Sequence, residues 1–113
     1  MDYDLIAEIQ AKTNDLQVAI RSLRKTGQRR AETERDYKIK LRQEALKLRD
    51  SGMAVGMIDK TVYGIESVAA ARYERDVAEA VYQANLESIN ATKLMLRLLD
   101  AQVNREWGGA IHD

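Results

Sequence analysis

The 113-residue chain contains no proline, no cysteine and no phenylalanine, and each absence limits what it can form. Without proline, no position forces a helix to end through the loss of a backbone N–H. Without cysteine, the chain has no disulfide, no thiolate nucleophile and no sulfur ligand for a metal, which fits a reducing cytoplasm. We therefore expect a cytoplasmic protein whose fold depends on helical packing.

The chain also lacks net charge and long apolar runs. Eighteen basic and eighteen acidic side chains cancel, so no global field directs the protein to nucleic acid or to a membrane. No stretch approaches the roughly 18 apolar residues of a membrane span, and the start MDYDLIAEIQ lacks the basic leader of a signal peptide. With 45% hydrophobic and 32% charged residues, the composition is typical of one soluble helical domain.

Residues that carry catalysis or bind metals are nearly absent. The one histidine, His112, lies close to the chain end, far from any acid that would orient it. No HExxH, P-loop or GxGxxG pattern occurs, and the inward Glu-x-x-His ligands of di-metal bundles are missing. We therefore predict no enzymatic activity, no metal site and no cofactor.

The first periodic segment predicts a long helix over residues 3–49. Apolar residues follow a three-four spacing at its two ends, through Ile6, Ile9, Thr13, Leu16, Ile20 and Leu23 and again through Tyr37, Leu41 and Leu48. The middle of this seam is polar and contains Gly27, which costs about 1 kcal/mol relative to alanine inside a helix. The middle is thus either a weak, exposed stretch or a hinge with a functional role.

The second segment predicts a helix over residues 66–107 with two apolar stripes. One stripe carries Ala78, Tyr82, Ile89, Leu96, Leu99 and Val103, and the other carries Tyr73, Val77, Val81, Ala84, Ala91, Met95 and Leu98. A lone hairpin covers only one stripe of each helix, so self-association is the economical explanation. We predict an all-α protein, a long antiparallel helical hairpin resembling a coiled coil, whose copies assemble as a four-helix bundle, with a dimer favoured.

The predicted subunit interface lies on the first of these stripes. Its residues are Tyr82, Ile89, Leu96, Leu99 and Val103. Gly108 and Gly109 predict the end of the second helix, which leaves a short tail over residues 108–113.

The connector over residues 50–65 is unusually apolar for a bundle loop. Val55, Ile58 and then Val62 or Tyr63 recur at helical spacing, which predicts a short helix between Gly52 and Gly64. One interpretation is that this helix closes the end of the bundle and buries Met53, Met57 and Ile58. The alternative is an adaptable docking patch for a protein, with Met53, Val55, Met57 and Ile58 exposed.

Charge is unevenly distributed between the two helices. Between Arg21 and Arg49 there are eleven basic and four acidic residues, a local charge of +7, whereas residues 51–113 carry six basic and nine acidic residues, or −3. The candidate face for an acidic partner or nucleic acid comprises Arg21, Arg24, Lys25, Arg29, Arg30, Arg35 and Lys38. Three explanations stay open: solvation by i,i+4 pairs, pairing with the second helix of a partner subunit, and phosphate binding. We favour subunit pairing, because no aromatic platform accompanies the cations.

A helix-turn-helix over Gly52–Arg72 has little support. Glu66, Ser67 and three alanines occupy the positions where cationic recognition residues are expected.

The segments LRDSGMAVGMIDK (48–60), RDVAEAVY (75–82) and KLMLRLLDAQVNREW (93–107) resemble small helical proteins of phages and prophages of Gram-positive bacteria. The resemblance covers nearly the whole chain but consists of packing and surface residues, so it assigns no site residue. It implies an accessory role in a host cytoplasm, since some such proteins bind and disarm host defence proteins and others serve replication or recombination. We expect an interaction protein, with a nucleic-acid accessory factor as the alternative.

Overall fold

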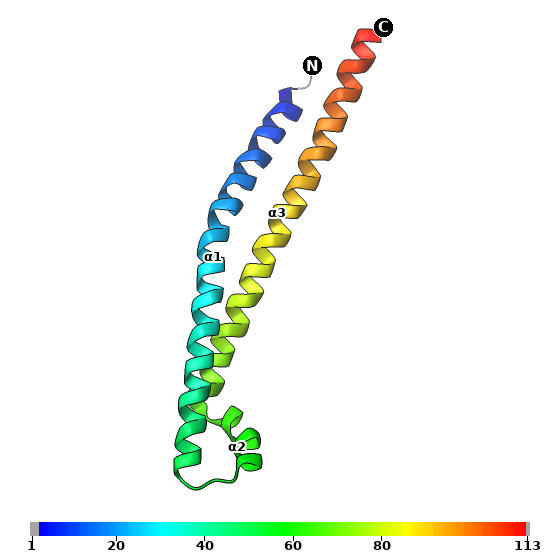
Figure 1. Cartoon of the computed structure of the whole chain (residues 1–113). Helices are drawn as coiled ribbons and strands as arrows, with labels where there is room; N and C mark the ends of the chain where they lie inside the picture. Colours follow the sequence, from blue (N-terminus) through cyan, green and yellow to red (C-terminus); the bar gives the residue numbers. More distant parts are fainter. Residues whose placement is uncertain (1–2, 113) are drawn as a thin grey trace. The chain divides into compact units, whose positions relative to one another are not determined.

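The computed structural model describes residues 3–112, and the side chains of residues 3–108. Two long α-helices, α1 (Tyr3–Asp50) and α3 (Glu66–His112), are joined by the short helix α2 (Val55–Thr61) and a 3₁₀ turn, η1 (Val62–Gly64) (Figure 1). No strand occurs within this described part of the chain. The all-α class, the two long helices and the short connecting helix are therefore confirmed, whereas assembly into a four-helix bundle stays a prediction.

The chain divides into two compact units, and each pairs a segment of α1 with a segment of α3. The terminal unit comprises Met1–Arg24 and Gln83–Asp113, and the connector unit comprises Lys25–Tyr82. In the connector unit the two helices run antiparallel: Gly27 lies against Tyr82, and Glu34 pairs with Arg75 further along.

Gly52 ends α1 and starts the turn towards α2. Its φ of +91° lies in the left-handed region, which side chains with a Cβ rarely adopt. The N–H of Gly52 donates to the Arg49 carbonyl at 3.0 Å, and the N–H of Met53 donates to the Leu48 carbonyl at 3.2 Å. These two hydrogen bonds form a Schellman cap, which satisfies the last carbonyls of α1.

The core of the connector unit lies where α1, η1 and the start of α3 meet. Val68 is fully buried, and it packs with Tyr37 and Val62. The surrounding half-buried residues are Leu41, Ala45, Leu48, Ile65 and Ala71. Ile58 brings α2 into the unit, since only 8% of its surface is exposed.

The terminal unit has a thinner core. Leu5 on α1 and Ile89 on α3 are its buried apolar residues among those described. Further along α3, Leu96, Leu99 and Val103 are half-buried. The Asn85 side chain donates a hydrogen bond to the Ala19 carbonyl at 2.9 Å, which links α3 to α1 in this unit.

Two details of the long helices differ from the sequence prediction. Ile20 was expected in the seam but is 48% exposed, and Ala19 is half-buried instead. At this point the inward-facing position falls one residue earlier than the predicted seam, because Leu16, Ala19 and Leu23 are half-buried and Ile20 is not. The helix stop at Gly108–Gly109 is also wrong: α3 continues to His112, because glycine weakens a helix but does not end it without a left-handed turn.

Replacing Gly27 and Gly52 with alanine should have opposite effects on the stability of the fold. A Cβ at Gly27 would meet the Tyr82 ring at 3.5 Å, an ordinary contact, so Gly27→Ala should stabilise the fold by about 1 kcal/mol through helix propensity. Gly52→Ala should destabilise it by about 1–2 kcal/mol, because its φ is positive. In thermal melts, the melting temperature of Gly27→Ala should lie above that of the wild type, and that of Gly52→Ala should lie below it. A lower melting temperature for Gly27→Ala would show that Tyr82 packs more tightly on this site than the structure indicates.

Candidate protein-binding surface

An apolar strip on α3 is exposed in the connector unit. Tyr73, Val77 and Val81 are 68%, 41% and 49% exposed. Their spacing of four residues keeps them on one face of the helix. This strip belongs to the second stripe that the sequence predicts, so the hairpin of a single chain leaves that stripe uncovered, as expected.

A groove beside this strip follows the line between α1 and α3. It has a volume of about 250 Å³ and is lined by Lys25, Thr26, Arg29, Glu74, Val77, Ala78 and Val81. Valine and alanine side chains from α3 form its apolar part. An ion pair between the helices borders the groove. The Arg29 guanidinium and the Glu74 carboxylate lie 3.1 Å apart. The surface therefore joins an apolar strip to a charged edge, as protein-binding surfaces commonly do.

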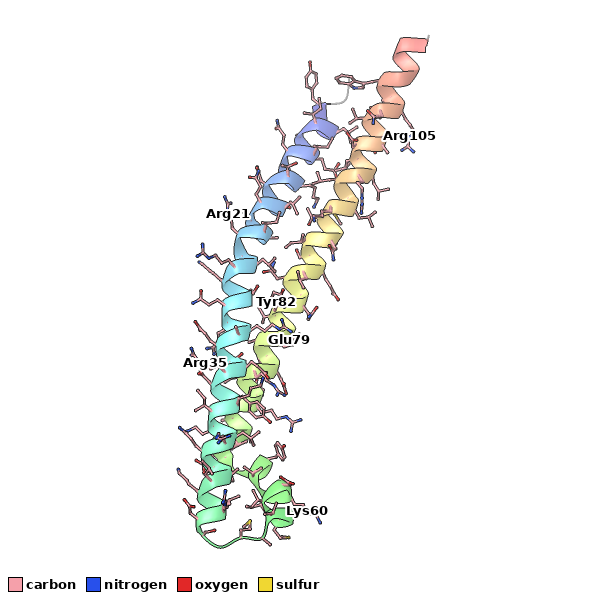
Figure 2. The ribbon with its side chains drawn as sticks, viewed as in Figure 1. Arg21, Arg35, Lys60, Glu79, Tyr82 and Arg105 are labelled. Carbon is pink, nitrogen blue, oxygen red and sulfur yellow. The ribbon has the colours of Figure 1, made fainter. Side chains whose placement is uncertain are left out.

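The opposite flank of the same helix pair is polar. A hollow of about 570 Å³ is lined by Gly27, Arg30, Ala31, Glu34, Arg75, Asp76 and Glu79. Arg30 forms an ion pair with Glu79 and stacks over Tyr82, with the guanidinium carbon 4.9 Å from the ring centre. Arg30 on α1 therefore contacts two side chains of α3, Glu79 and Tyr82, which are labelled in Figure 2. Sequence reasoning missed this arrangement, because it treated the arginines only as a basic band.

Arg75 is the most constrained cation of this polar flank. Its hydrogen bond to Asp76 is the main cause that raises the pKa of Arg75 above its ordinary value; desolvation opposes it, and the charges of Asp76, Glu34 and Tyr37 add to it. Arg75 also stacks over Tyr37, with the guanidinium carbon 4.4 Å from the ring centre. These contacts favour the charged form of the Arg75 guanidinium.

The terminal unit carries its own exposed apolar residues on α3. Leu94, Met95 and Leu98 are 51%, 46% and 62% exposed. Met95 and Leu98 belong to the same predicted stripe as Val77 and Val81. Both units therefore leave apolar α3 surface uncovered.

The residues predicted as a subunit interface lie on the buried and half-buried side of α3, and their role between subunits stays a prediction. Ile89 is buried, and the other four are half-buried on the same heptad spacing of α3. The first stripe therefore lies on the less exposed side of α3, and the second stripe is exposed. The complete list of these predicted residues is Tyr82, Ile89, Leu96, Leu99 and Val103.

Ion pairs within the chain neutralise part of the predicted basic face. Arg29 pairs with Glu74 and Arg30 with Glu79, so the second helix that neutralises them belongs to the same chain. Lys38 pairs with Glu34, and Arg35 pairs with Asp36 on the outer side of α1 (Figure 2). Arg21, Arg24 and Lys25 remain exposed.

The connector is neither wholly buried nor wholly exposed. Ile58 is buried and Met53 is half-buried, whereas Val55 and Met57 are 75% and 52% exposed. The prediction that Met57 is buried is wrong, because α2 has only seven residues and turns one face inward. Ile58 occupies that face, so of the predicted docking patch only Val55 and Met57 are fully available.

A scan against protein-family models and searches of curated proteins and of solved structures found no significant match. The resemblance to phage proteins therefore stays a prediction. None of the helices, over the residues described, contains a segment long and apolar enough to cross a membrane. Within the same residues, no cluster of three or more histidine or acidic side chains is arranged to hold a metal ion.

Proposed function

We propose that the protein is a non-enzymatic helical scaffold that acts by protein–protein binding, and that the exposed stripe of α3 pairs two copies into a four-helix bundle. The observation that carries this proposal is the uncovered strip Tyr73, Val77 and Val81 beside an open groove. In water, contiguous apolar surface of this kind favours association, because its burial releases about 25 cal/mol per Å².

The exposed area supports the same conclusion. The chain exposes 8428 Å², whereas a compact monomer of 12.8 kDa exposes about 6,300 Å². The difference of about 2,100 Å² exceeds the roughly 800 Å² that each partner buries in a standard interface. One interface of standard size would remove about 800 Å² of this excess.

The charges around the strip suit pairing of α3 with α3 of a second copy. Tyr73, Val77 and Val81 are flanked on α3 by Glu74 and Asp76, while Lys25 and Arg29 lie on α1 at the groove. In a twofold antiparallel pair, the basic edge of α1 from one copy approaches the acidic edge of α3 from the other. Such an arrangement adds charge complementarity to apolar contact.

A different protein would be the target of the assembled scaffold. Val55 and Met57 at the connector lie away from the α3 stripe in sequence and stay exposed, so they are the surface we assign to that target. In the phage setting suggested by the sequence, the target would be a host or defence protein that the scaffold inhibits.

Nucleic-acid binding is the second candidate function. Exposed Arg21, Arg24 and Lys25 support it, but the intrachain pairs of Arg29 and Arg30 reduce the charge available. If DNA binds, log K should fall by about 0.9 per neutralised phosphate for each tenfold increase in salt. We expect no binding at low salt in a titration of labelled single- and double-stranded DNA, and tight, salt-sensitive binding would favour the second function.

Val81→Asp should weaken self-association without unfolding the chain. Val81 is 49% exposed, so an aspartate remains solvated in the monomer, but in the proposed bundle it would be buried without a partner, at a cost of several kcal/mol. Ile39→Asp is the matched control, because Ile39 is 50% exposed on α1 of the same unit. Sedimentation velocity should show a shift to monomer for Val81→Asp alone. If the two variants sediment alike, the interface does not lie on this stripe of α3.

A further inference from the structure

An outward-facing segment of α1 carries a coiled-coil pattern over residues 35–50. Counted in heptads a to g, apolar Ile39 and Leu46 take the d positions. The flanking positions are all basic, with Arg35, Arg42 and Arg49 at g and Lys40 and Lys47 at e. In a coiled coil, residues at d contact the partner helix, and residues at e and g form ion pairs beside that contact. The segment therefore has the sequence of one coiled-coil strand with cations along both edges.

The two apolar residues of this segment are largely uncovered by their own chain. Ile39 and Leu46 are 50% and 43% exposed. The opposite side of α1 supplies the core, since Tyr37 is buried there and Leu41 and Leu48 pack against the same cluster. Thus α1 packs on its own chain through one face and leaves the face with Ile39 and Leu46 open.

Cations beside these apolar residues are available to a partner. Arg42 and Arg49 are exposed, and neither forms an ion pair with any residue that the structure describes. In contrast, Arg29 and Arg30, nearer the start of α1, pair with α3. Residues 35–50 carry six basic and three acidic side chains, a local charge of +3. The open face is therefore apolar at its d positions and positive along its edges.

The a positions of the pattern are polar. They are Asp36, Gln43 and Asp50. A polar residue at a lowers the stability of a coiled coil but restricts the partners that it accepts. The apolar contact thus depends on Ile39 and Leu46, and charge selects the partner.

A second copy of this face does not fit it, because cations would meet cations at every flanking position. We propose that residues 35–50 form a docking site for a parallel helix of a different protein, one with apolar residues at d and glutamate or aspartate at e and g. Charge complementarity identifies this occupant, since each arginine at g then faces an acidic residue at e. The site lies on α1, apart from the apolar stripe of α3, so it does not require self-association.

The test uses a labelled synthetic peptide of three heptads with leucine at d, alanine at a and glutamate at e and g. Fluorescence anisotropy should show saturable binding to the full wild-type chain at low salt, and weaker binding as salt screens the ion pairs. A matched peptide with lysine at e and g should not bind. Val81→Asp should bind the acidic peptide as the wild type does, because Val81 lies on the stripe of α3.

Two double variants separate the cations from the apolar residues. Arg42→Glu with Arg49→Glu should lower the affinity for the acidic peptide about tenfold or more, because attraction becomes repulsion at both positions. Ile39→Ala with Leu46→Ala leaves the charge unchanged and should also lower the affinity about tenfold, because it removes the apolar contact.

Arg21→Glu with Arg24→Glu is the matched control, because both cations are exposed on α1 and the change in net charge is that of Arg42→Glu with Arg49→Glu. It should bind the acidic peptide like the wild type. An equal loss in this control would trace binding to net charge alone and would overturn the proposal. Circular dichroism should show equal helicity for all of these variants, since exposed substitutions have small effects on stability.

Three other results would also overturn the proposal. One is no binding of the acidic peptide, and another is equal binding of the acidic and basic peptides. The third is unchanged affinity in Ile39→Ala with Leu46→Ala, since the cations alone would then form the site, as they would for the phosphates of nucleic acid. Sedimentation of Arg42→Glu with Arg49→Glu should match the wild type, so failure of the docking site leaves the pairing of α3 stripes untouched.

Discussion

Replacing Val68 with aspartate is expected to unfold the connector unit. Val68 is the one fully buried side chain among the described residues, and it packs between Tyr37 and Val62. A carboxylate there loses the valine contacts and is desolvated without a hydrogen-bond partner, which costs about 4 kcal/mol or more. Since whole domains are stable by only about 5–15 kcal/mol, the unit should lose its cooperative melt by circular dichroism.

Val55→Asp is the control for this change. It makes the same replacement on a side chain that is 75% exposed at the start of α2, where a negative charge suits the positive end of a helix. This variant should melt within a few degrees of the wild type. Similar losses at both positions would mean that the core lies elsewhere.

Ile89→Asp has the second largest expected effect, and we expect it to be local. Ile89 is 6% exposed in the terminal unit, so the lost apolar contacts and the buried charge should cost about 3–5 kcal/mol. Hydrogen exchange should then show loss of amide protection along residues 3–24 and 83–112 of the terminal unit, while amides around Val68 stay protected.

Val18→Asp serves as the control in the same unit, because Val18 is 55% exposed on α1. It should leave protection in both units unchanged. Uniform loss of protection across the whole chain in Ile89→Asp would instead show that the two units unfold as one.

The helices could be predicted from sequence because their apolar spacing is regular and no proline interrupts it. Gly52 and Gly64 correctly marked the connector. The end of α3 could not be predicted, because Gly108 resembles a cap in sequence and only a left-handed backbone would make it one. The one-residue shift at Ile20 arises where α1 has few apolar residues to define its inner face.

Site residues were harder to predict than the helices. Two stripes on α3 were visible, but periodicity alone does not tell which one packs on α1, and Tyr82 and Ile89 were assigned to the subunit interface on that basis. The ion pairs of Arg29 and Arg30 with α3 depend on the antiparallel register of the helices, which composition does not specify. The repeat of Arg-x₃-Glu-x₂-Tyr at Arg30 and Arg75 was the available signal for the ion pairs Arg30–Glu79 and Arg75–Glu34, and a search for internal repeats would find it.

The mass of the protein in solution tests the central claim most directly. Sedimentation equilibrium at micromolar concentration should give twice the chain mass of 12.8 kDa, and the same mass in high salt, because contact between apolar stripes is not screened by ions. A mass that falls to that of one chain in high salt would assign pairing to the basic band instead. A stable monomer at all salt concentrations would contradict the proposal that the α3 stripe pairs two copies.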